Sequence, residues 1–171
     1  MKLEKLLSQP DILPKLAKNT EQPIKALFRK LKSKKPGNLD AFVHQKHELY
    51  FAQVDCLDCG NCCKSLGPRL RMPDIERLAK FLKIKTKDFI EQYLRIDEDQ
   101  DFVFKTMPCP FLDDDNYCFV YENRPKACRE YPHTDRKKFY QVLPETLQNR
   151  STCAVVYQIC EDIKDKYSSK K

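Results

Sequence analysis

The spacing of apolar residues predicts a chain built mainly from short helices. Ile24, Leu27, Phe28 and Leu31 follow the i, i+3, i+4, i+7 pattern of a helix with one apolar face. Three prolines, at positions 10, 14 and 23, interrupt the region before this stripe. Because proline breaks helix interiors, several short helices are expected there rather than a single long one.

Helical signals continue along the rest of the chain. Further helices are predicted from residue 38 or 40 to about 54, over 73–82 and 87–95 as a helical hairpin, and from residue 151 or 152 to about 167. The last of these places Cys153, Val156, Cys160 and Ile163 on one inner face. Residues 124–132 predict a tight turn or a single helical turn.

Two short stretches indicate β structure. Phe102–Phe104 is expected as a short strand. Residues 110–112 and 117–121 are expected to pair as a hairpin around the polar turn 113–116. The predicted fold class is therefore α+β, a mainly helical small domain with one short β-hairpin.

Charge is unevenly distributed. Apolar residues make up 41% of the chain and charged residues 33%, which is typical of a globular protein. Residues 1–38 hold ten Lys/Arg and three Asp/Glu, a net +7, whereas residues 39–171 hold 22 of each. We therefore predict a basic helical N-terminal extension, 1–38, and a metal-binding domain, 39–171, within a single domain overall. The Lys/Arg residues between 25 and 35 could contact nucleic acid, although a solvated helix face is the simpler interpretation.

The sequence indicates no membrane span, because no run approaches the ~18 apolar residues that one needs. The start of the chain lacks the apolar stretch of a secretory signal. A cytoplasmic location is therefore expected. Thiols stay reduced there, so the cysteines are interpreted as metal ligands rather than disulfides.

Nine cysteines supply the candidate chemistry. Four lie within eight residues, at Cys56, Cys59, Cys62 and Cys63. A Cys-x-x-Cys loop brings two sulfurs about 3.5–4 Å apart, the edge of a thiolate tetrahedron. Adjacent residues tend to point apart, so Cys62 and Cys63 are not expected to share one ion readily. The other five are Cys109, Cys118, Cys128, Cys153 and Cys160.

These residues resemble the YkgJ-like cysteine-cluster family, which is named for its CxxCxxCC signature. The resemblance is carried by the four clustered cysteines, Cys109-Pro-Phe-Leu, Cys118, and Arg124-Pro-x-x-Cys128-Arg-x-Tyr-Pro132. It implies a zinc- or iron-chelating domain, and the overlapping Cys-x-x-Cys loops leave a 4Fe–4S cluster open as the form of the iron. The metal-site residues it implies are Cys56, Cys59, Cys62, Cys63, Cys109, Cys118, Cys128 and Cys153. Cys160 matches no motif and is expected to be a small buried side chain.

Two other classes of function stay open at this point. Some members of the family are described as S-adenosylmethionine-dependent lysine methylases, and a cluster could also support redox catalysis. With three glycines the chain offers no GxGxxG-type loop for a nucleotide-like cofactor. The third class is an adaptor for nucleic acid or a protein partner, in which metal braces the fold. His44, His47 and His133 are weaker candidates for metal ligation.

Overall fold

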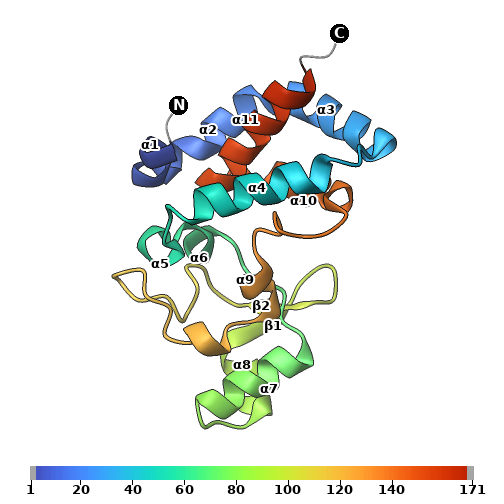
Figure 1. Cartoon of the computed structure of the whole chain (residues 1–171). Helices are drawn as coiled ribbons and strands as arrows, with labels where there is room; N and C mark the ends of the chain where they lie inside the picture. The colour runs from blue at the N-terminus through green and yellow to red at the C-terminus, as the bar shows by residue number, and fades with distance from the viewer. Residues whose placement is uncertain (1–2, 169–171) are drawn as a thin grey trace. The chain divides into compact units, whose positions relative to one another are not determined.

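The computed structural model describes residues 3–168 and divides the chain into two compact units (Figure 1). Unit 1 comprises the residues up to 55 and those from 132 onwards, and unit 2 comprises Cys56–Tyr131. Residues 1–38 therefore share a unit with the helix that follows them and with the C-terminal helix. All the predicted metal ligands except Cys153 lie in unit 2.

Unit 1 is helical throughout its regular structure. Its elements are α1 (Leu3–Ser8), η1 (Pro10–Ile12), α2 (Leu13–Asn19), α3 (Glu21–Lys34), α4 (Leu39–Phe51), η3 (Phe139–Gln141), α10 (Leu143–Asn149) and α11 (Ala154–Ser168). The long helix α11 packs against α3 and α4 (Figure 1). The predicted series of short N-terminal helices is confirmed.

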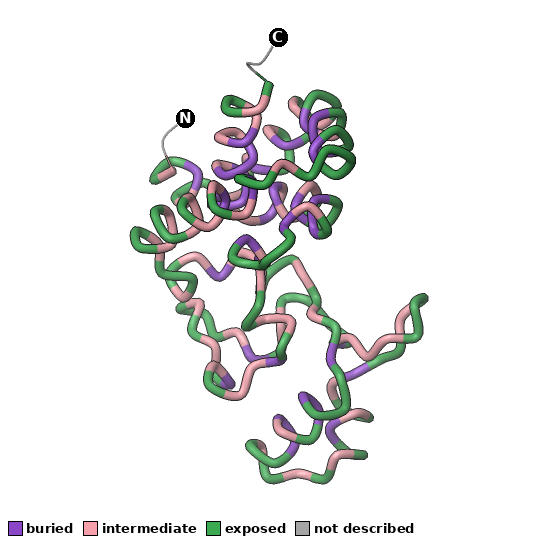
Figure 2. The backbone as a smooth tube through the Cα atoms, turned by 45° about the vertical axis from the view of Figure 1, so that its right-hand side comes forward, coloured by how far each residue is buried: buried purple, intermediate pink, exposed green. Residues whose placement is uncertain are grey.

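Amphipathic helices form the core of unit 1. Ile24, Leu27, Phe28 and Leu31 of α3 are all at most 7% exposed, which confirms the predicted stripe. Burying side chains of this size stabilises the fold by roughly 2 kcal/mol each. They pack with residues of α4, η3 and α11, so buried and exposed positions alternate along these helices (Figure 2). The N-terminal region is thus part of the unit 1 core.

Unit 2 combines short helices with a small sheet. Its elements are α5 (Cys56–Cys59), α6 (Asn61–Ser65), α7 (Met72–Phe81), α8 (Thr86–Tyr93), β1 (Leu94–Ile96), β2 (Phe102–Phe104), η2 (Tyr121–Asn123) and α9 (Lys126–Glu130). Strands β1 and β2 pair antiparallel, with Leu94 opposite Phe104 and Ile96 opposite Phe102. The α+β class, mainly helical with one two-stranded sheet among the described residues, is confirmed.

The position of the hairpin differs from the prediction. The sheet spans 94–104, and β1 occupies the end of the segment predicted as helix 87–95. The Asp97 carboxylate closes the turn by accepting the backbone N–H groups of Asp99 and Asp101, each at 3.0 Å. Residues 110–121 turn back on themselves but pair only through an isolated bridge between Leu112 and Cys118. Helix α10 was not predicted at all.

An aromatic cluster anchors the irregular part of unit 2. The Phe111 ring contacts those of Tyr93 and Phe104, at centroid distances of 5.2 and 5.6 Å. Phe111 is 6% exposed and belongs to the same core as Phe89 and Leu78. Because Phe111 lies two residues after Cys109, this packing fixes one end of the cysteine-bearing turn.

Candidate metal centre

The CxxCxxCC segment folds as two single helical turns joined by Gly60. Cys56 and Cys59 lie on α5, and Cys62 and Cys63 lie on α6. Gly60 has φ +57°, a left-handed conformation that favours glycine. The sulfur atoms of Cys62 and Cys63 are 4.0 Å apart and share a hydrogen bond. These adjacent side chains thus lie closer together than expected, and whether they share one ion stays a prediction.

The segment 109–118, which carries Cys109 and Cys118, contacts the CxxCxxCC segment 56–63 at two points. The Cys109 backbone N–H donates to the Cys63 carbonyl at 2.9 Å. The Asn116 side-chain amide donates to the Asp58 carbonyl at 3.0 Å. Gly60 is buried between them, and a Cβ atom there would lie 2.8 Å from Asn116 Oδ1. Tertiary contacts thus hold 56–63 and 109–118 side by side.

Gly60→Ala should separate these two segments. Alanine in a left-handed conformation costs about 1–2 kcal/mol, and the clash with Asn116 adds to this. We expect the free energy of unfolding to fall by roughly 2 kcal/mol in urea titrations. Gly37→Ala is the matched control, because its added Cβ meets nothing within 4 Å. A Gly60→Ala variant as stable as Gly37→Ala would contradict this docking.

Four thiols of unit 2 lie within electrostatic range of one another. Burial, with a smaller contribution from negative charge on Cys63, raises the pKa of Cys109 to about 11 and that of Cys128 to about 12. Burial, and then Cys63, also raise the pKa of Cys118. The pKa of Cys63 itself is lowered to about 7, first by its hydrogen bond with Cys62 and, against burial, by Arg124 and Lys64. Cys63 is therefore the electrostatic centre of the group.

Arg124 supplies positive charge beside these thiols. Its guanidinium lies 3.6 Å from the centroid of the Tyr121 ring, and it favours the thiolate forms of Cys63, Cys118 and Cys128. Its Nε is buried and has no acceptor within residues 3–168. A buried donor of this kind suits a thiolate, which accepts hydrogen bonds more strongly than a thiol.

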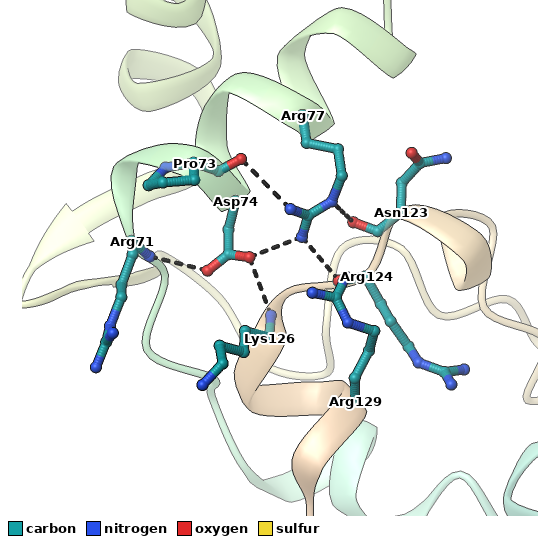
Figure 3. A network of polar contacts seen from close by, with 8 residues as sticks. All are labelled: Arg71, Pro73, Asp74, Arg77, Asn123, Arg124, Lys126 and Arg129. Carbon is teal, nitrogen blue, oxygen red and sulfur yellow. Dashed lines mark hydrogen bonds and ion pairs between the residues drawn. The ribbon is translucent and has the colours of Figure 1, made fainter.

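A polar network fixes the turn that carries Arg124 and leads to Cys128 (Figure 3). The Asp74 carboxylate accepts from Arg77 at 2.7 Å and from the Lys126 backbone N–H at 3.0 Å. Arg77 in turn donates to the carbonyls of Asn123 and Arg124, at 3.2 and 3.0 Å. Burial would raise the pKa of Asp74, but the Arg77 and backbone donors outweigh it and lower that pKa. Helix α7 thus clamps 123–126 in place.

Sequence reasoning did not identify Asp74 or Arg77 as part of the site. The available signal was the spacing of an acid and an arginine three residues apart at a helix start. Asp74 also accepts the Arg71 backbone N–H at 3.2 Å, an ordinary capping contact. Nothing in the sequence shows that the same pair reaches a turn about fifty residues away.

The remaining cysteines lie in unit 1. Cys153 immediately precedes α11, and its backbone N–H donates to the Asn149 carbonyl at 2.8 Å. Cys160 is fully buried in the unit 1 core, and burial raises its pKa to about 12, as suits a small apolar side chain. Within unit 2 the structure therefore brings together Cys62, Cys63, Cys109, Cys118 and Cys128. Cys56 and Cys59 lie on the adjoining turn.

The thiols of unit 2 are neighbours, but they do not form a coordination shell. Among residues 3–168, no three His, Cys, Asp or Glu side chains converge as the ligands of one ion. Buried, uncharged thiols have no electrostatic reason to converge, and a bound cation supplies that reason by favouring thiolates. The donor set, soft sulfurs beside an unpaired guanidinium Nε, fits zinc or iron.

His44 and His47 have structural partners. His44 Nε2 lies 3.1 Å from the Arg136 carbonyl, and His47 Nδ1 lies 2.7 Å from the hydroxyl of buried Thr134. Both side chains extend from α4 to the segment 133–138. They hold this segment in place, which accounts for them without a metal.

The His47 contact predicts a pH dependence of stability. Burial lowers the pKa of the His47 imidazole below its usual value of about 6.5. The unfolded chain then binds more protons than the folded one, so the free energy of unfolding falls as the pH drops below about 6.5. In urea titrations at a series of pH values, the free energy of unfolding should fall less steeply with decreasing pH for His47→Gln than for the wild type. Identical slopes in the two proteins would refute the assignment.

The comparison with protein families bears directly on the cysteines. A family model named CxxCxxCC, with the description "Putative zinc- or iron-chelating domain", matches residues 55–157. The chain belongs to the CxxCxxCC family. The resemblance drawn from the motifs is thus confirmed, and the match takes in every predicted ligand from Cys56 to Cys153. A search of curated proteins and a search of solved structures each found no match.

The family description says only that the domain chelates zinc or iron. It names neither the ligands nor the cellular role. Residues 1–54 lie outside the match. Within residues 3–168, no helix combines the length and the apolar character needed to cross a membrane.

Proposed function

We propose that this protein binds zinc or iron through thiolates of unit 2. The observation that carries the proposal is the docking of Cys63 against Cys109, joined by a 2.9 Å backbone hydrogen bond. It places two cysteine segments, 46 positions apart in the chain, in electrostatic range of each other and of Cys118 and Cys128.

We assign the principal ligand role to Cys63, Cys109, Cys118 and Cys128. Four thiolates suit a tetrahedral zinc ion or the irons of a 4Fe–4S cluster. Cys56, Cys59 and Cys62 would complete a larger or second site on the adjoining turns. Cys153 lies in unit 1 and is a candidate from the family resemblance alone. A bound metal would supply Lewis acidity or, in a cluster, electron transfer.

The proposed metal has a structural consequence for unit 2. Residues 105–120 contain no helix and no strand of the named sheet, and the turns that carry the cysteines are short. A thiolate site would cross-link these turns, so metal binding and the folding of unit 2 should be coupled. Reduced thiols are required, which favours the cytoplasm as the proposed location.

Anaerobic purification followed by elemental analysis and an absorbance spectrum tests the proposal. We expect zinc or iron at one or more atoms per chain, with a colourless protein for zinc and a broad band near ~400 nm for an iron–sulfur cluster. Thiol alkylation should be slow until a chelator is added. A protein that retains neither metal, takes up neither on reconstitution, and has equally reactive thiols with and without chelator would refute the proposal.

A further inference from the structure

A group of exposed cations on unit 1 plays no part in the metal proposal. We define the basic patch as six residues, three around the end of α3 and three in the segment before η3. They are Lys32, Lys34, Lys35, Arg136, Lys137 and Lys138, and all six are exposed. Lys35 Nζ lies 5.0 Å from the centroid of Tyr140 in η3, and η3 packs against α3 and α4. The two halves of the patch therefore meet at η3.

No acidic residue neutralises the basic patch. None of the six side chains forms an ion pair within residues 3–168. The Asp40 carboxylate contacts the patch segment but is occupied, because it accepts the backbone N–H groups of Lys138 and Phe139 at 2.6 and 2.9 Å. Asp135, in the segment before η3, is exposed, and Glu21 lies at the opposite end of α3. The six cations therefore outnumber the two acids that lie beside them along the chain, Asp40 and Asp135.

The segment that carries half of the patch is held rigidly. Asp40, His44 and His47 occupy the i, i+4 and i+7 positions of α4 and therefore share one face. His47 contacts the hydroxyl of residue 134, His44 contacts the carbonyl of residue 136, and Asp40 accepts the backbone N–H groups of residues 138 and 139. A segment that merely connected two helices would not need three side-chain anchors. This anchoring presents Arg136, Lys137 and Lys138 in fixed backbone positions.

Two of the lysines occupy positions that glycine would fill at lower cost. Lys35, which caps the end of α3, has φ +46°, and Lys138 has φ +58°. A left-handed residue other than glycine costs roughly 1–2 kcal/mol, and glycine is the usual residue at the first of these positions. Lysine at the end of α3 also offsets the helix dipole, but that dipole amounts to about half a charge. It accounts for neither the number of cations nor those at 136–138.

We propose that the basic patch binds the phosphate backbone of a nucleic-acid duplex. The apolar face of α3 is buried in the core, so this helix has no free apolar face to insert into a bilayer. Tyr140, next to the patch, is half-buried, and Lys35 lies over one face of its ring, which leaves it poorly placed for base stacking. Fixed cations without stacking side chains suit contacts to duplex phosphates, which carry no sequence information.

The test measures binding of the full-length protein to a fluorescent 20-base-pair DNA duplex and its RNA counterpart, by anisotropy over a range of salt concentrations. We expect the logarithm of affinity to fall with the logarithm of salt with a slope of about −3 to −5, as for four or five phosphate contacts. Alanine at Arg136, Lys137 and Lys138 together should weaken binding at least tenfold and reduce the slope by about 2–3. Alanine at Lys32, Lys34 and Lys35 should do the same independently.

The matched control removes the same charge from unit 2. Lys80, Lys85 and Lys87 are exposed on α7, before α8 and within α8, and their triple alanine variant should bind as the wild type does. Equal loss in this control would show diffuse attraction and overturn the proposal, as would undiminished binding by both patch variants. Binding to anionic vesicles or to polyglutamate without binding to either duplex would replace it with a membrane or an acidic protein partner.

Discussion

The Cys63→Ser variant should fail to retain the zinc or iron proposed for unit 2. Cys63 is the thiol whose charge reaches Cys109, Cys118 and Cys128, and it shares a hydrogen bond with Cys62. A serine hydroxyl is a poor ligand for zinc or iron in a sulfur site. Loss of a residue that only supports a ligand already weakens metal binding by about 10–100-fold. Loss of a ligand should therefore weaken metal binding by more than about 100-fold. Competition with a chromogenic chelator measures this.

Cys160→Ala provides the matched control for that experiment. Cys160 is fully buried in unit 1 and has no place in the proposed site. Its replacement should lower the free energy of unfolding by about 1–2 kcal/mol through a small cavity, with the metal content unchanged. The account fails if Cys63→Ser retains metal as tightly as the wild type, or if Cys160→Ala loses metal to the same extent.

Asp74→Ala should destabilise the protein strongly for a change of one polar side chain. The Asp74 side chain is 5% exposed, and its loss removes the ion-pair partner of Arg77 and the acceptor of the Arg71 and Lys126 backbone N–H groups (Figure 3). Breaking a buried ion pair costs about 3–5 kcal/mol. Arg77 is 30% exposed, so water can solvate it, and we expect the lower limit, about 3 kcal/mol, in urea titrations.

The same variant should also weaken metal retention. Asp74 touches no cysteine in the contacts described above, and it acts as a positioning residue by fixing 123–126 ahead of Cys128. Lys126→Ala is the control, because it keeps the backbone N–H and removes only an ion pair with Glu130 whose side chains are 55% and 47% exposed. That control should cost less than about 0.5 kcal/mol. Equal effects of Asp74→Ala and Lys126→Ala would rule out the clamp.

The helices that local periodicity describes were predictable. The α3 stripe repeats over two turns, so its apolar face could be read before any tertiary contact was known. Helix α10 spans seven residues with a proline in its first turn, too few positions for a period to emerge. Strand β1 continues directly from α8, and only its pairing with β2 shows that the helix has ended.

The candidate site shows the same division between local and tertiary information. Spacing predicted that Cys-x-x-Cys loops bring neighbouring sulfurs together, because such a loop is a local structure, but it did not predict the two short helices α5 and α6. The docking of Cys109 on Cys63 depends on Gly60, Asn116 and the Phe111 core, which come together only in the fold. The roles of Asp74 and His47 depend on turns more than fifty residues away, so no local pattern could reveal them.

X-ray absorption at the edge of the retained metal tests the central claim most directly. The account predicts a first shell dominated by sulfur at about 2.3 Å, with Cys63→Ser losing the metal or at least one sulfur from that shell. A shell made only of nitrogen and oxygen, or a sulfur shell unchanged in Cys63→Ser, would contradict the proposal that thiolates of unit 2 gather around the ion.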